Sequence, residues 1–349
     1  MLFRSIEQLS QTEKADIYAT IYLAALVIPI VSVIGVTLGA IGLRRRIAAL
    51  RLQGVDAQRI AQLTAPEGEA TKVNWWIIGG GAAFVAFTLA VGLSDIPLNE
   101  EIIFVGSMAI VLFLMRQLIQ ELPPDARGPL VGTAVIIFIF RCTPLPGPGA
   151  TWWEIDVLGF DQQFLAILSL ITSGFALAGM IVLRPMMARR TIADVVVILS
   201  IASGLLSLPI IGLYYGLHEW TSHLTGGLVD ARFIALIDTA IESPLAQISM
   251  VPMLAWIAKN APAHLKATFF AVMASFTNLA LSASSLLTKY LNEVLVVERE
   301  VRDHVTGAIQ VPADYSKLGL LLITVTALTV IVPLVAVVLV QASPLRTRQ

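Results

Sequence analysis

The chain has 349 residues, of which 57% are hydrophobic and 13% are charged, and its formal net charge is −1. Soluble domains carry about 25% charged residues, so this composition excludes a soluble protein and predicts an all-α polytopic membrane protein. The near-neutral charge gives no reason to expect nucleic-acid binding. Because Cys142 is the only cysteine, an intrachain disulfide and a cysteine-based metal site are also excluded.

Nine apolar stretches are long enough to cross a bilayer, which takes about 20 helical residues. The polar first sixteen residues lack the pattern of a signal peptide, and short loops with turn residues separate most of the stretches. The predicted spans are 17–43, 75–93, 102–120, 130–148, 162–184, 192–215, 231–258, 265–290 and 316–341.

Lysine and arginine are concentrated in alternate loops, for example in Arg44, Arg45 and Arg46 of the segment 44–74. The positive-inside rule therefore places that loop and the C-terminus in the cytoplasm, and we expect a multi-pass protein of a bacterial-type inner (plasma) membrane. Twelve spans with both ends inside would need three spans before residue 17. We therefore expect helices four to twelve of a twelve-helix protein; a genuine nine-span protein is the alternative.

This count predicts three regions. Residues 1–120 form a partial N-terminal bundle of three spans that includes the cytoplasmic loop 44–74. Residues 121–129 form a central cytoplasmic loop, and residues 130–349 form a C-terminal bundle of six helices.

Two carboxylates, Asp238 and Glu242, lie one helical turn apart on one face of the span 231–258. An ionised group at mid-bilayer costs about 2.5–3.5 kcal/mol, so such groups usually serve a function. At about 1.5 Å per residue, Glu242 and Arg141 each lie about 16 Å into their predicted spans. We therefore expect Arg141 to face Glu242 or Asp238 across a central cavity. A static ion pair that holds two helices together is the alternative.

Other polar and conformationally special residues complete the candidate site. Pro244 follows Glu242 and should loosen its helix. Arg116 is a further cation within a span, and Asn278 and Gln247 either hydrogen-bond a substrate or join helices to each other.

The stretch RCTPLPGPG after Arg141 contains three prolines, which forbid a regular helix there. Trp152 and Trp153 follow it. They fit either an aromatic belt at the outer interface or a stacking surface for a substrate ring.

The sequence contains no His/Glu metal cluster, no Ser–His–Asp order and no phosphate-binding loop. We therefore expect no enzyme, no metal and no cofactor. The main hypothesis is a monomeric secondary transporter for a small-molecule substrate. A non-transporting membrane assembly or pigment-delivery factor on the same fold is the alternative.

Three segments carry a family resemblance. TWWEIDVLGFDQQFL contains Leu158–Gly159–Phe160, and GMIVLRPMMARR follows the fifth span. The third segment runs from Asp238 through Pro252 and Ala261–Pro262 to Ala267–Ala271 and Asn278. Together they resemble the folate–biopterin transporter family of the major facilitator superfamily. Gly179, Arg184, Arg189 and Arg190 look like a degenerate copy of that superfamily's cytoplasmic loop.

The resemblance covers residues 130–341, which would be helices seven to twelve, and it makes the first three spans helices four to six. It implies a major-facilitator-type bundle that takes up pterin-like or folate-like compounds together with protons, by alternating access. In that setting Arg141, Glu242 and Asp238 would bind substrate or proton. Pro244, Pro252 and the residues of the loop after span 162–184 would serve conformational change.

Overall fold

The computed structural model describes residues 19–20, 22–56, 59–60, 75–94, 96–182, 190–246, 266–303 and 308–347; the side chains of 180, 242–246, 266 and 267 lie outside this description. The chain divides into two compact units, Met1–Ala70 and Thr71–Gln349. In the first unit, helix α2 (Val27–Leu52) belongs to an apolar stretch from Tyr22 to Leu52 that is long enough to cross a bilayer. Since α2 continues to Leu52, the first part of the predicted loop 44–74 is helical.

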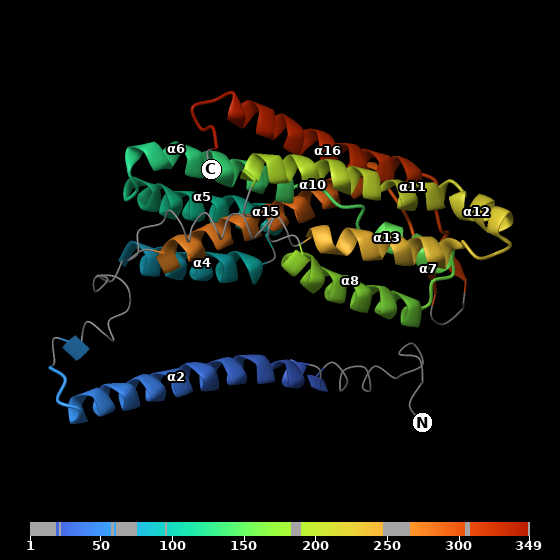
Figure 1. Cartoon of the computed structure of the whole chain (residues 1–349). Coiled ribbons are helices and arrows are strands. Elements are labelled where there is room, and N and C mark those ends of the chain that lie inside the picture. The colour runs from blue at the N-terminus through green and yellow to red at the C-terminus, as the bar shows by residue number, and fades with distance from the viewer. Residues whose placement is uncertain are drawn as a thin grey trace. The chain divides into compact units, whose positions relative to one another are not determined.

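The second unit is built almost entirely from helices (Figure 1). They are α4 (Trp75–Gly92), α5 (Asn99–Gln120), α6 (Pro124–Arg141), α7 (Pro148–Asp156), α8 (Gln162–Val182), α10 (Ile192–Leu206), α11 (Leu208–Tyr214), α12 (Leu217–Thr225), α13 (Ala231–Ala246), α15 (Lys266–Val294) and α16 (Leu318–Gln341). Strands β1 (Val301–Arg302) and β2 (Ile309–Val311) form a small antiparallel hairpin between α15 and α16.

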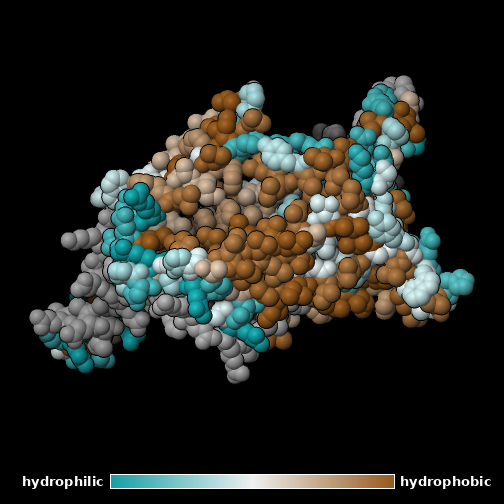
Figure 2. Space-filling view, turned by 90° about the horizontal axis from the view of Figure 1, so that it is seen from above, coloured by the Kyte–Doolittle hydropathy of each residue, from teal (hydrophilic) through white to brown (hydrophobic). Residues whose placement is uncertain are grey.

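Seven helical segments in the described part of the chain are long and apolar enough to cross a membrane. Two further predicted spans correspond to α6, which carries three charged residues, and to α13, of which 16 residues are described. Large apolar side chains on the helices are exposed, such as Leu170 at 74% and Val338 at 66%. Figure 2 shows a broad band of hydrophobic surface with hydrophilic residues gathered at its ends. The chain is an all-α, multi-pass integral membrane protein.

Two hydrophobic clusters form most of the core of the second unit. The first joins α5, α6, α10 and α15 to the C-terminal part of α16, with Ile136 and Phe269 fully buried in it. The second joins α7, α8, α11 and α13 to the N-terminal part of α16, around Phe160, Leu213 and Leu318. Helix α16 therefore runs between the two clusters. The end of the unit that carries α7 and the β-hairpin is called the hairpin end below.

Candidate functional site

Helix α6 ends at Arg141, as the prolines predict. Cys142 is the C-cap, residues 143–147 have no regular secondary structure, and α7 begins at Pro148. Gly147 has φ +77°, a left-handed conformation that favours glycine. The segment 143–147 therefore replaces the last part of a helical crossing, and the prediction of an unwound chain after Arg141 is confirmed.

Side chains of α15 hydrogen-bond the backbone of this unwound segment. Ser284 Oγ donates to the carbonyl oxygen of Thr143 at 2.6 Å, and the Leu145 N–H donates to Thr288 Oγ1 at 2.8 Å. Irregular backbone at membrane depth is tolerated where protein satisfies its polar groups in this way. Helix α15 thus fixes the chain just beyond Arg141.

Replacing Gly147 by alanine should destabilise the protein. A Cβ atom there would lie 3.0 Å from Asn292 Nδ2, and the positive φ adds a penalty of about 1–2 kcal/mol for an L-residue. We expect a lower midpoint of thermal unfolding in detergent. The control is Gly174→Ala in α8, where a Cβ meets open space and alanine favours the helix. Equal midpoints for Gly147→Ala and the parent protein would contradict the assigned strain.

Arg141 is half-buried at the end of α6. Its Nε atom is buried and has no hydrogen-bond partner among the described residues. The next residue, Cys142, packs against Ala280 and Ala283 of α15 in a small apolar cluster. A guanidinium N–H that is removed from water without an acceptor is costly, so this position suits an anionic ligand or a carboxylate.

The two acidic candidates lie on α13. Asp238 is half-buried there. Helix α13 packs against α8, α10, α11 and α12, whereas α6 packs against α10, α15 and α16, so the two helices share α10 as a neighbour. Glu242 lies one turn further along α13, and its side chain lies outside the described residues, as does that of Pro244. A pairing of Arg141 with Glu242 or Asp238 stays a prediction.

The other predicted residues that the structure describes lie on different parts of the chain. Asn278 on α15 and Arg116 on α5 are exposed, and Gly179 is buried in α8. Arg190 is exposed just before Thr191, the N-cap of α10, which forms a capping box with Asp194. The remaining candidates lie outside the described residues: Gln247, Pro252, Arg184 and Arg189.

A groove of about 580 Å³ runs between α4, α5 and α15; we call it the α4–α5–α15 groove. Its lining combines two aromatic rings and aliphatic side chains with hydroxyl and charged groups: Phe84, Thr88, Glu100, Ile103, Phe104, Ser107, Leu279, Ser282, Ser285, Leu286 and Lys289. Its volume lies within the range of about 300–1,000 Å³ that is usual for small-molecule sites.

Two hydroxyl groups in this groove are buried without a hydrogen-bond partner among the described residues, Thr88 Oγ1 and Ser107 Oγ. Ser107 is only 1% exposed. Serine and threonine in helices commonly bond to a carbonyl one turn earlier. Ser285, also in the groove, does so by donating to the carbonyl oxygen of Leu281 at 3.1 Å. Ser107 and Thr88 are therefore free to bond a ligand.

Charged groups stand at one end of the groove. Lys289 Nζ donates to Glu100 Oε2 and Glu101 Oε1, each at 3.1 Å, and Tyr290 Oη donates to Glu101 Oε1 at 2.7 Å. The other carboxylate oxygen of Glu101 is buried without a described partner. Two carboxylates and one ammonium thus leave one negative charge at this place.

Sequence reasoning missed the α4–α5–α15 groove. Glu100 and Glu101 directly precede the predicted span 102–120, and Lys289 lies near the end of the span 265–290, which runs in the opposite direction. These opposite charges are expected at the same membrane face, and they could have predicted that the two helices lie side by side. The hydroxyl groups gave no comparable signal, because serine and threonine are also common in close helix packing.

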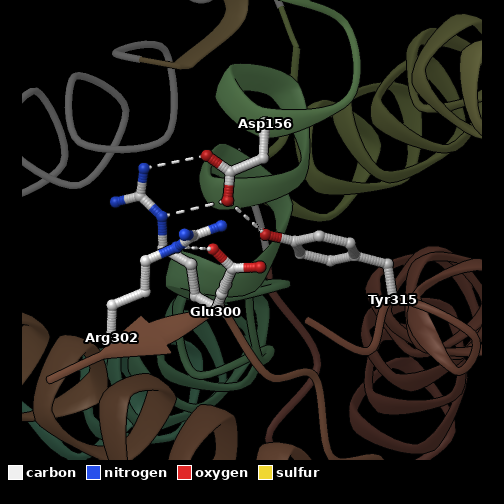
Figure 3. A network of polar contacts seen from close by, with 5 residues as sticks. Asp156, Glu300, Arg302 and Tyr315 are labelled. Atoms are coloured by element: carbon white, nitrogen blue, oxygen red, sulfur yellow. Dashed lines mark hydrogen bonds and ion pairs between the residues drawn. The ribbon is translucent and has the colours of Figure 1, made fainter. Parts of the chain in front are cut away.

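A second polar cluster ties the hairpin end together (Figure 3). Arg299 donates to both carboxylate oxygens of Asp156, at 3.0 and 2.8 Å, and Tyr315 Oη donates to the same carboxylate at 2.6 Å. Arg299 lowers the pKa of Asp156, while burial, together with this carboxylate, raises the pKa of Tyr315 to about 12. The cluster attaches the chain on both sides of the β-hairpin to α7.

Trp153 of α7 belongs to the core rather than to a surface. It is 5% exposed and lies 5.6 Å from the Tyr214 ring, centroid to centroid. Both readings of this tryptophan, as an interface belt or as a stacking surface for a substrate, are therefore wrong. A nine-residue α7 turns it inward onto α11.

Glu154, also on α7, should make stability depend on pH. Burial raises the pKa of its carboxyl from 4.5 to about 7. The stability it contributes is therefore complete below pH 4.5 and is lost as pH rises through 7. Glu154→Gln should remove this dependence on pH. Above pH 7 the variant should have a free energy of unfolding up to about 3 kcal/mol higher than that of the parent protein, since one pKa unit is about 1.4 kcal/mol.

The measurement is the midpoint of thermal unfolding from pH 5 to 8. The control is Glu219→Gln on α12, an exposed position. Parallel pH profiles for Glu154→Gln and the parent protein would contradict the prediction.

Fold and geometry together define a polytopic helical membrane protein with a polar groove between three of its helices and an unwound segment that follows Arg141. The model of the BT1 family matches residues 7–347, and the chain belongs to the BT1 family. This confirms the family resemblance.

A folate-biopterin transporter from Synechocystis sp. (strain ATCC 27184 / PCC 6803 / Kazusa) is 26% identical over 162 residues. The match covers 45% of this chain and 31% of the relative, so the matched segment spans about a third of that protein's length. No solved structure matches the chain.

Proposed function

We propose that the protein is a secondary active transporter that moves a small polar or anionic organic solute, pterin-like or folate-like, together with protons. Membership of the BT1 family across residues 7–347 is the observation that carries this proposal. The similarity to a folate-biopterin transporter supports the solute class. We place the protein in a bacterial-type inner membrane with its C-terminus in the cytoplasm, on the distribution of lysine and arginine.

The polar groups within the apolar helices support transport. A solute that crosses a membrane needs hydrogen-bonding groups at membrane depth, and such groups are expensive to keep there without a function. Thr88 and Ser107 provide hydroxyl groups, and Arg141 a guanidinium N–H, that have no hydrogen-bond partner in the part of the chain that the structure describes. An open groove lined by the hydroxyl groups of Thr88 and Ser107 favours a transporter over an assembly factor with a filled core.

In the proposed mechanism Arg141 alternates between two anions. With Glu242 or Asp238 ionised, the guanidinium pairs with that carboxylate, which lowers the desolvation cost of both charges. Protonation neutralises the carboxylate and frees Arg141 for an anionic or polar group of the solute. Since the solute and the proton then occupy the protein together, they cross together.

Conformational change in this mechanism uses special backbone positions. Pro244 and Pro252 have no backbone N–H to donate, and we propose that they lower the cost of bending the predicted span 231–258 beyond Asp238. Gly179 lies in α8, and Arg184, Arg189 and Arg190 follow this helix in the sequence before α10 begins. We propose that the helices shift here during alternating access. Alternation between two membrane faces exposes the site to one side at a time.

Ligand-dependent thermal stabilisation tests the solute class. The purified full chain is heated with biopterin, with folate and with unrelated anions such as citrate. We expect biopterin or folate to raise the unfolding midpoint in a concentration-dependent manner, because a ligand that binds the folded state stabilises it. Stabilisation by citrate but by neither biopterin nor folate would contradict the proposed solute class.

A further inference from the structure

The α4–α5–α15 groove has the chemistry of a site for a flat ring with polar edges. Phe84 and Phe104 line it from different helices, and aromatic side chains favour stacked or edge contacts with another ring. Aliphatic groups such as Ile103 and Leu286 complete the apolar part of the lining. A long saturated polar molecule would leave these surfaces unmatched.

The unpartnered hydroxyl groups identify the polar edge of that ring. Ser107 is almost fully buried, lines the groove, and makes no hydrogen bond within the described chain. On the neighbouring helix α4, Thr88 Oγ1 is also buried and also has no hydrogen-bond partner among the described residues. A hydroxyl both donates and accepts, so the pair suits ring nitrogens and carbonyl oxygens.

The charge at the end of the groove selects against anions. Glu100 lines the groove directly, and the neighbouring Glu101 has one carboxylate oxygen, Oε2, that is buried and has no hydrogen-bond partner among the described residues. Lys289 neutralises one of these two carboxylates. The remaining negative charge attracts N–H donors, such as a ring amino group, and repels an added carboxylate.

We propose that the α4–α5–α15 groove binds the uncharged heteroaromatic ring of the transported solute, with its ring faces on Phe84 and Phe104, its polar edge on Ser107 and Thr88, and an amino group toward Glu100. This inference rests on the proposed function and narrows it. The groove discriminates in favour of a neutral pterin over the same ring carrying two carboxylates. It assigns ring recognition to α4, α5 and α15 and not to α6, the helix that carries Arg141.

Equilibrium binding of radiolabelled biopterin to the full chain in nanodiscs tests the proposal, with folate as the competitor. Ser107→Ala should weaken biopterin binding about fivefold to tenfold, the effect of one lost hydrogen bond. The matched control is Ser200→Ala on α10, a serine that is equally buried (0% exposed) and also unpartnered among the described residues. Ser200 does not line this groove, and its variant should bind as the parent does.

Two further variants keep the test decisive if Ser107→Ala folds poorly. Ser282→Trp places a bulky ring in the groove from an exposed position and should abolish biopterin binding without disturbing the core. Glu100→Gln removes a negative charge and should improve folate competition relative to biopterin about tenfold. The unfolding midpoint of each variant reports whether the fold is retained.

The outcomes separate the two levels of the proposal. If the parent binds biopterin and folded Ser107→Ala and Ser282→Trp variants bind it equally well, the groove is not the ring site, while the proposed function stands. If the parent binds neither biopterin nor folate, the proposed function itself fails.

Discussion

Replacing Arg141 by glutamine is expected to reduce the initial rate of solute uptake about 100-fold. Removing one partner of a buried charge pair costs about 2–5 kcal/mol, and 100-fold corresponds to about 2.7 kcal/mol. Arg141 is half-buried beside an unwound segment, and its Nε–H has no acceptor among the described residues, so solvent cannot replace the lost charge well. The rate is measured in proteoliposomes that contain equal amounts of folded protein.

Two comparison variants give this result its meaning. Arg141→Lys keeps the charge but loses the planar fork of the guanidinium, and we expect an intermediate rate. Arg302→Gln removes an exposed arginine of the β-hairpin and should leave the rate unchanged. Wild-type uptake by folded Arg141→Gln would show that Arg141 only supports the structure.

Replacing Glu242 by glutamine is expected to uncouple transport from protons. Glutamine mimics the protonated carboxyl but cannot release a proton, so a pH gradient can no longer drive accumulation. Exchange of solute across the membrane needs no net proton movement and should continue. Uptake is compared with and without an acidic exterior, and exchange is measured between labelled and unlabelled solute.

Asp238→Asn provides the comparison for this second prediction. By residue count Asp238 lies about 6 Å nearer the start of α13 than Glu242 does, at about 1.5 Å per residue. We therefore expect Asp238→Asn to slow uptake but to leave the dependence of uptake on the pH gradient unchanged. Full pH-gradient-driven uptake by Glu242→Gln would exclude Glu242 as the proton carrier.

The sequence was most informative about the helices. Apolar length predicted membrane spans, because the bilayer imposes the same length on every crossing. The prolines after Arg141 predicted an irregular segment, and α6 ends at Arg141, before the expected end of the span at residue 148. The ends of other helices were predicted less accurately. Helix α2 continues past Arg44, where the loop was expected to begin, because a charged helix can extend beyond the apolar region without interruption.

The candidate site was predicted only in part. Charges within spans stand out in a sequence, which is why Arg141, Asp238 and Glu242 were found. The α4–α5–α15 groove joins Ser107 on α5 to Ser282 on α15, far apart along the chain, and only packing brings them together. The burial of Trp153 was likewise not predicted, because its place in the core depends on how the short α7 lies against α11.

Uptake of labelled biopterin by the unmodified chain in proteoliposomes tests the central claim most directly. With an acidic exterior, transport with protons predicts accumulation above the outside concentration, and a protonophore should abolish it. Folded protein that binds biopterin but equilibrates it no faster than empty liposomes, with or without the pH gradient, would contradict the claim.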